Sequence, residues 1–235
     1  MSVWAISDLH LSHARPMPRE QFALRWRDHA TRIAQQWREV VRRDDLVLLP
    51  GDLSMARNHR EVQPDLEWLE SLPGTKLLTP GNHDVWWNGV AKVSPLLRKS
   101  QRAVCGNAIE LSGVVVCGAQ GYDPNAEDDN LAHKNRVSRE SQLLESALDR
   151  AATLRNPGVP LYILWHYPPF DRHGRAAPCV QQFEAAGATA VVYGHLHTVS
   201  QWSRAVNGVV NGVRYACVAA DAIGFRPLRI DGSRR

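Results

Sequence analysis

Side chains that can bind a metal ion follow five short apolar runs of this sequence. They are Asp8 and His10 after the run at 2–7, Asp52 after 46–50, Asn82, His83 and Asp84 after 75–80, His166 after 161–165, and His195 and His197 after 189–194. A turn can use Asn or Asp for local hydrogen bonds, but it does not need a histidine between them. Their recurrence after five runs predicts one shared site rather than five separate turns.

The donor types indicate which metals would fit such a site. Asp8, Asp52, Asn82 and four histidines offer oxygen and imidazole ligands without a thiolate, which suits Mn²⁺, Fe or Zn²⁺ better than Ca²⁺. Seven ligands are too many for one tetrahedral zinc, and they fit two ions that share a carboxylate. Two ions about 3.5–4 Å apart can clamp both the attacking and the leaving oxygen of a displacement at phosphorus. We therefore expect two divalent ions per chain, with Mn²⁺ favoured.

Each of these residues also has a simpler interpretation when it is considered alone. A single Asp after a strand is usually a helix cap or a turn residue, and a single histidine is usually a hydrogen-bonded surface or core group. The order and position of the whole set argue against that interpretation. Asp8 and His10 are two residues apart, as are His195 and His197, so each pair would point to one side of an extended segment.

The elements that must position these residues alternate between strands and helices. Apolar runs predict strands at 2–7, 46–50, 75–80, 113–119, 161–165 and 189–194, and a late hairpin that turns near 211–212. Apolar residues at spacings of three and four predict helices over 19–43, around 65–72 and near 138–154. This alternation favours an α/β fold in which ligands bind at the carboxyl ends of the strands. The polar stretch 121–136 is expected to be a long loop.

Length and composition are consistent with one domain over residues 1–235. The chain carries 28 basic and 24 acidic residues, a net charge of +4, which is too weak a bias to indicate specific nucleic-acid binding. No apolar stretch approaches the about 20 residues that cross a bilayer, and the first apolar run begins too early for a cleaved signal peptide. Four widely spaced cysteines predict reduced thiols. We expect a cytoplasmic protein whose oligomeric state the sequence leaves open.

The ordered motifs D-x-H, G-D, G-N-H-D, a lone His and G-H-x-H resemble those of the calcineurin-like metallophosphoesterase superfamily, over about residues 3–197. Two local sequences, "PGNHD" followed by "WW" and "WHYPP", are also similar to those of a small group of bacterial predicted phosphohydrolases. The resemblance implies a four-layer α-β-β-α sandwich with two facing mixed β-sheets flanked by helices.

The resemblance also implies roles for individual residues. One ion would be held by Asp8, His10 and His197, the other by Asn82, His166 and His195, and Asp52 would bridge them. A metal-bridging hydroxide would attack phosphorus while His83 acts as the general acid. Asp84 would orient the His83 ring.

The sequence departs from the Ser/Thr protein phosphatases of this superfamily. Ala56 stands where they carry an arginine that grips the phosphoryl group, and Arg57 is one residue late. A small nucleotide-type phosphodiester, including cyclic nucleotides, is therefore the favoured substrate, because a diester carries a single negative charge. A phosphomonoesterase acting on nucleotides or sugar phosphates is the alternative, and a non-catalytic metal-binding scaffold is an alternative of another class. His13, His173 and Arg175 are further candidates for substrate contacts, with solvent-facing loops as the competing interpretation.

Overall fold

The computed structural model describes residues 1–15, 24–126 and 131–231. The first of its two sheets contains five strands in the order β11-β1-β2-β3-β4. Its strands are β1 (Val3–Ala5), β2 (Leu46–Pro50), β3 (Thr75–Thr79), β4 (Gln101–Ala103) and β11 (Leu228–Arg229). Strands β1 to β4 pair in parallel, and β11 pairs antiparallel with β1.

The second sheet contains six strands in the order β5-β6-β7-β8-β10-β9. Its strands are β5 (Asn107–Leu111), β6 (Val114–Ala119), β7 (Leu161–Trp165), β8 (Ala190–Tyr193), β9 (Gly208–Val210) and β10 (Val213–Cys217). The four central strands are parallel, while β5 and β9 pair antiparallel at the edges. The predicted hairpin is confirmed, and both residues of its turn, Asn211 and Gly212, have positive φ.

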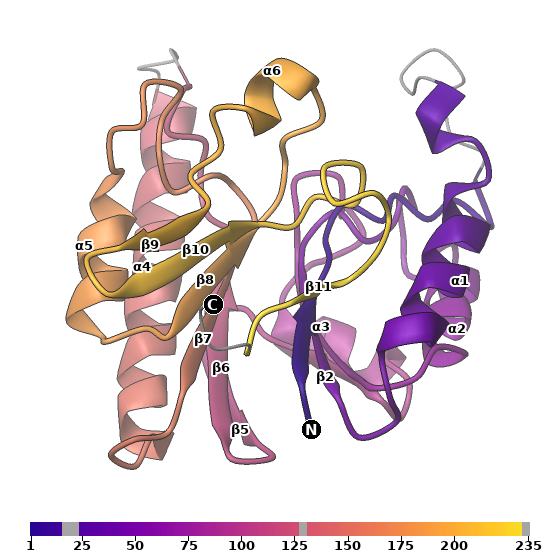
Figure 1. Ribbon diagram of the computed structural model, residues 1–235, viewed down its shortest axis with the longest axis horizontal. Helices are drawn as coiled ribbons and strands as arrows, with labels where there is room; N and C mark the ends of the chain where they lie inside the picture. The colour runs from indigo at the N-terminus through magenta and orange to yellow at the C-terminus, as the bar shows by residue number, and fades with distance from the viewer. Residues whose placement is uncertain (16–23, 127–130, 232–235) are drawn as a thin grey trace.

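Three apolar clusters separate four layers, which confirms the predicted architecture (Figure 1). Alternate residues of β2 face opposite ways, because side chains alternate along a strand. Leu46 and Leu48 face the second sheet, whereas Val47 and Leu49 pack beneath the helices on the outer face. Both faces of each central strand are buried, which explains the nearly continuous apolar runs of the sequence.

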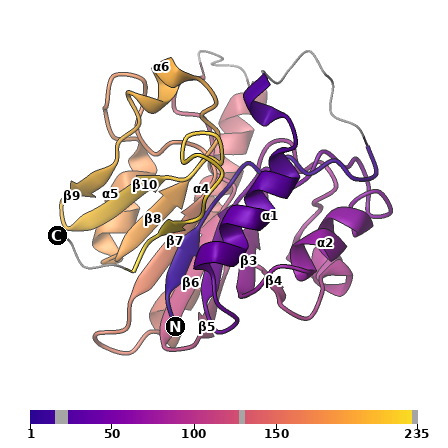
Figure 2. The same ribbon diagram turned by 45° about the vertical axis from the view of Figure 1, so that its right-hand side comes forward.

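Helices cover the outer face of each sheet. The helices are α1 (His29–Val40), α2 (Gln63–Glu70), α3 (Val90–Val93), α4 (Leu131–Leu154), α5 (Pro178–Ala185) and α6 (Val199–Trp202), with 3₁₀ turns at Leu24–Trp26 and Ser94–Leu96. Figure 2 shows α1 and α2 lying across the first sheet, and α4 and α5 pack on the second. Among the described residues, no helix combines the length and apolar character that crossing a membrane requires.

Two element boundaries differ from the predictions. The helix expected over 19–43 begins only at His29, after a 3₁₀ turn that carries Trp26, and ends at Val40; Phe22 lies outside the described residues. The loop expected over 121–136 is helical from Leu131 onward, because α4 starts earlier than the predicted 138. The first two turns of α4 are mostly exposed, so they lack the apolar periodicity that marks its second half.

Candidate metal centre

The metal-ligand candidates lie on loops that continue from the strands and bond to one another. Backbone hydrogen bonds of 2.9–3.0 Å run from Asp8 N to Gly51 O, from His10 N to Asp52 O and from Gly194 N to His166 O. The two sheets also meet here, because Ser7 N donates to Val218 O at 2.9 Å. Backbone pairing beyond the strand ends therefore fixes the loops from which the candidate ligands project.

The glycines of the motifs are required by close approach between these loops. A Cβ on Gly81 would overlap the Asp52 carboxylate, and one on Gly194 would overlap the Asp8 carboxylate. The sequence could not reveal this reason, since each glycine makes room for a residue distant in the chain.

One group of four side chains can hold a metal ion. Asp8, His10, Asp52 and His197 each offer a ligand atom, and these atoms all lie within 4.8 Å of one another. His10 Nε2 lies 3.3 Å from His197 Nε2, and His197 Nε2 lies 3.3 Å from Asp8 Oδ1. Asp8, His10 and Asp52 are buried, whereas the His197 side chain is 29% exposed.

The other three candidates form an adjoining group. Asn82 Oδ1 lies 2.9 Å from both His166 Nε2 and His195 Nδ1. His166 Nε2 is also 3.6 Å from Asp52 Oδ2, and its Nδ1 is 3.0 Å from the Pro50 carbonyl. That carbonyl orients the ring and leaves Nε2 directed toward Asn82 and Asp52.

Four of the seven candidates adopt left-handed backbone conformations. The φ angles of Asp8, His10, Asp52 and His195 are 56°, 42°, 52° and 70°. Asp8 and His10 therefore converge through a strained turn rather than through the extended segment that the sequence suggested. Such strain is characteristic of functional sites, where the surrounding structure must hold it.

Burial sets the protonation of most of these groups. It lowers the pKa of His10 and of His166 below the usual histidine value and that of His195 to about 4. Neutral imidazoles of this kind are the form that binds metals. Burial and the charges of Asp8 and Asp84 instead raise the pKa of Asp52 well above its usual range. The ionised form of Asp52 is therefore unfavourable, and a cation beside it would stabilise that form.

His197 differs because a second carboxylate supports it. Burial alone would lower the pKa of His197, but hydrogen bonds to Asp221 and Asp8 outweigh it and raise the value to about 10. Asp221 Oδ1 lies 3.3 Å from His197 Nδ1, opposite the nitrogen that faces Asp8. Asp221 was not among the predicted site residues, although this residue too follows an apolar run, the one that forms β10.

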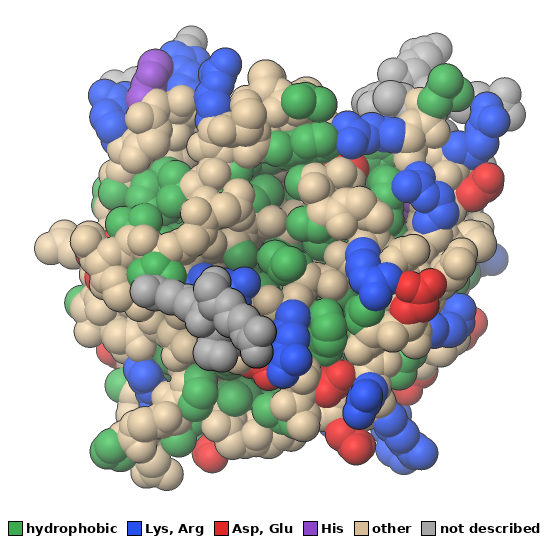
Figure 3. All heavy atoms as spheres, in the orientation of Figure 1, with side chains coloured by type: hydrophobic (Ala, Val, Ile, Leu, Met, Phe, Trp, Pro, Cys, Tyr) green, Lys and Arg blue, Asp and Glu red, His purple; other side chains and the backbone are tan. Residues whose placement is uncertain are grey.

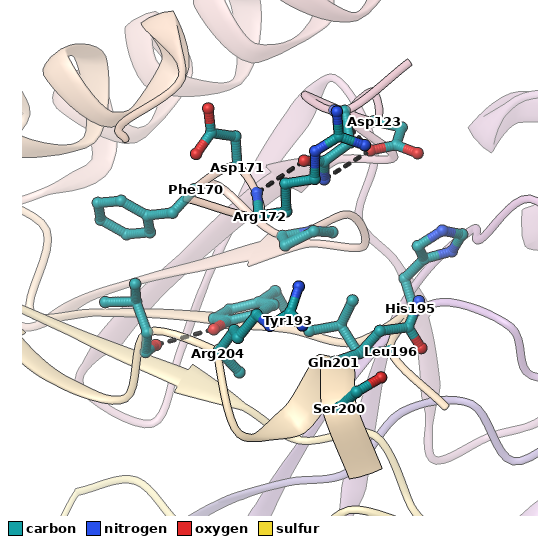
Figure 4. A pocket seen from close by; sticks show the side chains of 14 residues that line it. Asp123, Phe170, Asp171, Arg172, Tyr193, His195, Leu196, Ser200, Gln201 and Arg204 are labelled. Carbon is teal, nitrogen blue, oxygen red and sulfur yellow. Dashed lines mark hydrogen bonds between the residues drawn. The ribbon is translucent and has the colours of Figure 1, made fainter. Parts of the chain in front are cut away.

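Two hollows adjoin this set of residues. The His195 hollow encloses about 260 Å³, and its lining includes Phe170, Tyr193, His195, Leu196, Gln201 and Arg204. The Asn82 hollow encloses about 300 Å³, and its lining includes Asn82, Trp87, Gln120, Arg139 and Glu140. Figure 4 shows His195 at one end of the His195 hollow and Phe170 at the other, with Tyr193 between them. Asn82, which lines one hollow, lies 2.9 Å from His195, which lines the other.

Comparison with known proteins identifies the origin of this arrangement. The family model described as "Calcineurin-like phosphoesterase" matches residues 1–199. The chain belongs to this family. It is also 36% and 37% identical, over 83 residues, to the "Gene 66 protein" of Mycobacterium phage L5 and of Mycobacterium phage D29. Each match covers 35% of this chain and 40% of the relative, so it spans less than half of those relatives' length.

Two solved structures align with most of this chain at low sequence identity. The phosphopantetheinyl hydrolase of Mycobacterium tuberculosis is 15% identical, with a TM-score of 0.56 over 99% of this chain and 96% of that one. A protein of unknown function from Aquifex aeolicus is also 15% identical, with a TM-score of 0.48 over 97% and 95%. At 15% identity, the similarity to this hydrolase shows a shared fold and not a shared substrate.

The family uses a dinuclear centre of divalent ions, and the residues of this chain fit one. Asp52 stands between the two groups, with Oδ2 at 3.8 Å from His10 Nε2 and 3.6 Å from His166 Nε2. Its Oδ1 accepts the His83 N–H at 2.8 Å, but Oδ2 is buried without a hydrogen-bond partner. A buried carboxylate oxygen without a donor is costly unless a cation faces it. Ions shared between the two groups would therefore account for the position of Asp52.

The role expected of Asp84 is wrong. Its carboxylate does not hold the His83 ring but accepts N–H bonds from Leu53, Ser54, Gly81 and the Trp86 indole, at 2.9–3.1 Å. These bonds satisfy a buried carboxylate and tie the "GNHD" turn to the loop that carries Asp52. Asp84 is thus a structural anchor of the loops that carry the candidate ligands, and His83 is exposed beside it.

The three weaker candidates have other partners. His13 Nδ1 lies 2.7 Å from the buried Asp65 carboxylate, and Arg175 Nε donates to Asp171 at 2.6 Å. His173 donates its backbone N–H to the same Asp171. Neither of the two hollows is lined by any of them, whereas their neighbour Arg172 lines the His195 hollow.

Surface charge on the face shown in Figure 3 is mixed, with acidic side chains lying among the basic ones over α1.

Proposed function

We propose that this protein is a metal-dependent phosphoester hydrolase, and more narrowly a phosphodiesterase that acts on small nucleotide-type or cyclic nucleotide substrates. The observation that carries the proposal is the pair of ligand groups that share Asp52, whose Oδ2 is buried without a donor. The activity follows from family membership together with this arrangement. The surroundings of the site support the narrower substrate class.

The chain's residues divide into two ligand sets. Asp8, His10 and His197 would hold one divalent ion, Asn82, His166 and His195 would hold the other, and Asp52 would contact both. Mn²⁺ is the favoured ion, and Fe or Zn²⁺ suits the same donors. When bound, the ions supply a Lewis acid that polarises the phosphate and an activated water.

His83 is the proposed general acid. Its backbone N–H is fixed on Asp52 Oδ1, and its ring centroid lies 5.3 Å from that of His10. The exposed ring thus lies beside His10 of one ligand group, which supports a role in protonating a leaving oxygen. Asn82 and Asp84, on either side of it in sequence, fix the turn from two directions.

Two features favour a diester over a monoester. Ala56 is buried and offers no cation where related phosphatases carry arginine, and a diester needs less charge compensation than a monoester dianion. Two separate hollows also adjoin the ligand groups, one lined by His195 and the other by Asn82. A diester has two organic substituents to occupy them, and a monoester has one.

The test compares bis-p-nitrophenyl phosphate with p-nitrophenyl phosphate, using purified protein with Mn²⁺ added. We expect the higher kcat/KM on the diester. A higher value on the monoester would favour the phosphomonoesterase, and metal binding without turnover of either substrate would favour a non-catalytic scaffold.

A further inference from the structure

The His195 hollow has the position of a substrate pocket. It is formed by the segments that follow β6, β7 and β8, and the last of these carries His195 and His197. A phosphorus atom held at the ligand groups would therefore lie at its mouth. At about 260 Å³, it is close to the lower end of ligand pockets, about 300 Å³, so it suits one small organic group.

The lining of the hollow is amphipathic. Phe170, Tyr193 and Leu196 are buried and form an apolar floor. The Tyr193 hydroxyl donates to Val206 O at 2.8 Å, which fixes its ring with the polar end turned to the backbone. Such a floor favours a flat or weakly polar group such as a base or a sugar face.

Unused hydrogen-bond donors stand on the wall formed by α6. Among the described residues, the Arg204 guanidinium has no hydrogen-bond or ion-pair partner, although the backbone N–H of Arg204 donates to Gln201 O. Gln201 uses its amide oxygen for the N–H groups of His197 and Thr198, which leaves its NH₂ group available. Asp123, on another wall, accepts the N–H of Asn125. The hollow thus offers both donors and an acceptor to a bound group.

We propose that the His195 hollow binds the organic arm of a phosphodiester, an arm of nucleoside size with a hydrogen-bond-accepting oxygen that Arg204 holds. This inference rests on the proposed function. The oxygen belongs either to the base and sugar or to a second phosphate, and both present the same acceptor chemistry to a guanidinium. Arg204 is then a specificity-determining residue, distinct from the ligand groups and from His83.

The kinetic test uses two diesters with the same leaving group. p-Nitrophenyl thymidine 5′-phosphate carries a nucleoside arm, and bis-p-nitrophenyl phosphate does not. Arg204→Ala removes a charged hydrogen bond, so we expect KM for the thymidine ester to rise about tenfold or more, with hydrolysis of the bis-aryl ester unchanged. Ser200→Trp should act in the same direction by filling the hollow. Arg150→Ala, at an exposed position on α4, is the matched control and should change neither substrate.

A binding measurement keeps the inference independent of turnover. Isothermal titration calorimetry compares thymidine with thymidine 3′,5′-bisphosphate in the wild type and in Arg204→Ala. Weaker binding of both ligands assigns the oxygen to the base or sugar, and weaker binding of the bisphosphate alone assigns it to a phosphate. Unchanged affinity for both ligands overturns the inference. If the wild type fails to hydrolyse the bis-aryl ester, the proposed function fails, and calorimetry alone decides on the hollow.

Discussion

Replacing Asp52 with asparagine tests the shared-ligand arrangement most directly. The substitution keeps the size of the side chain and the oxygen that accepts the His83 N–H at 2.8 Å. It replaces the donor-free Oδ2 with an NH₂ group and removes a carboxylate whose Oδ2 faces histidines of both ligand groups. Because a neutral group replaces a buried charge, we expect no loss of thermal stability in metal-free protein.

The effect should appear when metal is added. An ion present at about 100 times its Kd stabilises a fold by about 2.7 kcal/mol, and about 2–4 °C per kcal/mol applies to a chain of this length, so each site contributes about 5–11 °C. Differential scanning calorimetry with and without Mn²⁺ should show this rise in the wild type and most of it lost in Asp52→Asn. Turnover should fall at least about 100-fold, since even residues that only support a ligand change activity about 10–100-fold.

Elemental analysis completes the measurement. The wild type should contain two ions per chain, and Asp52→Asn one or none. Asp149→Asn removes an exposed carboxylate of α4 and should match the wild type throughout. A folded Asp52→Asn protein that retains both ions and most of its turnover would refute the shared-ligand reasoning.

Three further outcomes follow from individual contacts. His83→Ala should lower turnover of an alkyl or ribose ester about 10²–10⁴-fold and affect a nitrophenyl ester far less, with metal content retained; equal losses on both esters would contradict its role as an acid. Each Asp84 oxygen accepts two N–H groups, and Asp84→Asn replaces one of these oxygens with an NH₂ group. Two buried donors then lose their acceptor, so chemical denaturation should show a lower free energy of unfolding, by about 2 kcal/mol or more. Its residual activity should fall equally on the alkyl and the nitrophenyl ester. A larger loss on the alkyl ester would instead indicate that Asp84 orients the His83 ring. Gly194→Ala should lose metal binding, because its Cβ would overlap the Asp8 carboxylate; titration with Mn²⁺ checks this, and wild-type affinity would show that the loop can move.

The strands that carry the candidate ligands could be predicted from the sequence, because they are buried on both faces. Strands such as β2 and β7 are apolar at every position or nearly so, and this signal needs no tertiary context. The edge strand β5 gave no such signal, since four of its five residues are at least partly exposed. The start of α4 was not predicted for the same reason, because its exposed first turns bury no apolar stripe.

The sequence by itself determined which side chains could hold metal, because ligand chemistry belongs to residue type and the strand ends are marked by local pattern. Only the tertiary structure decided how they meet. His195 N reaches Asp8 across 187 positions of the chain, and His166 reaches Asn82 across 84. Those distances depend on the register of two sheets and on glycines that let loops approach closely. For the same reason, the Asp84 carboxylate accepts hydrogen bonds from the backbone at 53–54 and not from its neighbour His83. Hydrogen bonds depend on proximity in space and not on order in the sequence.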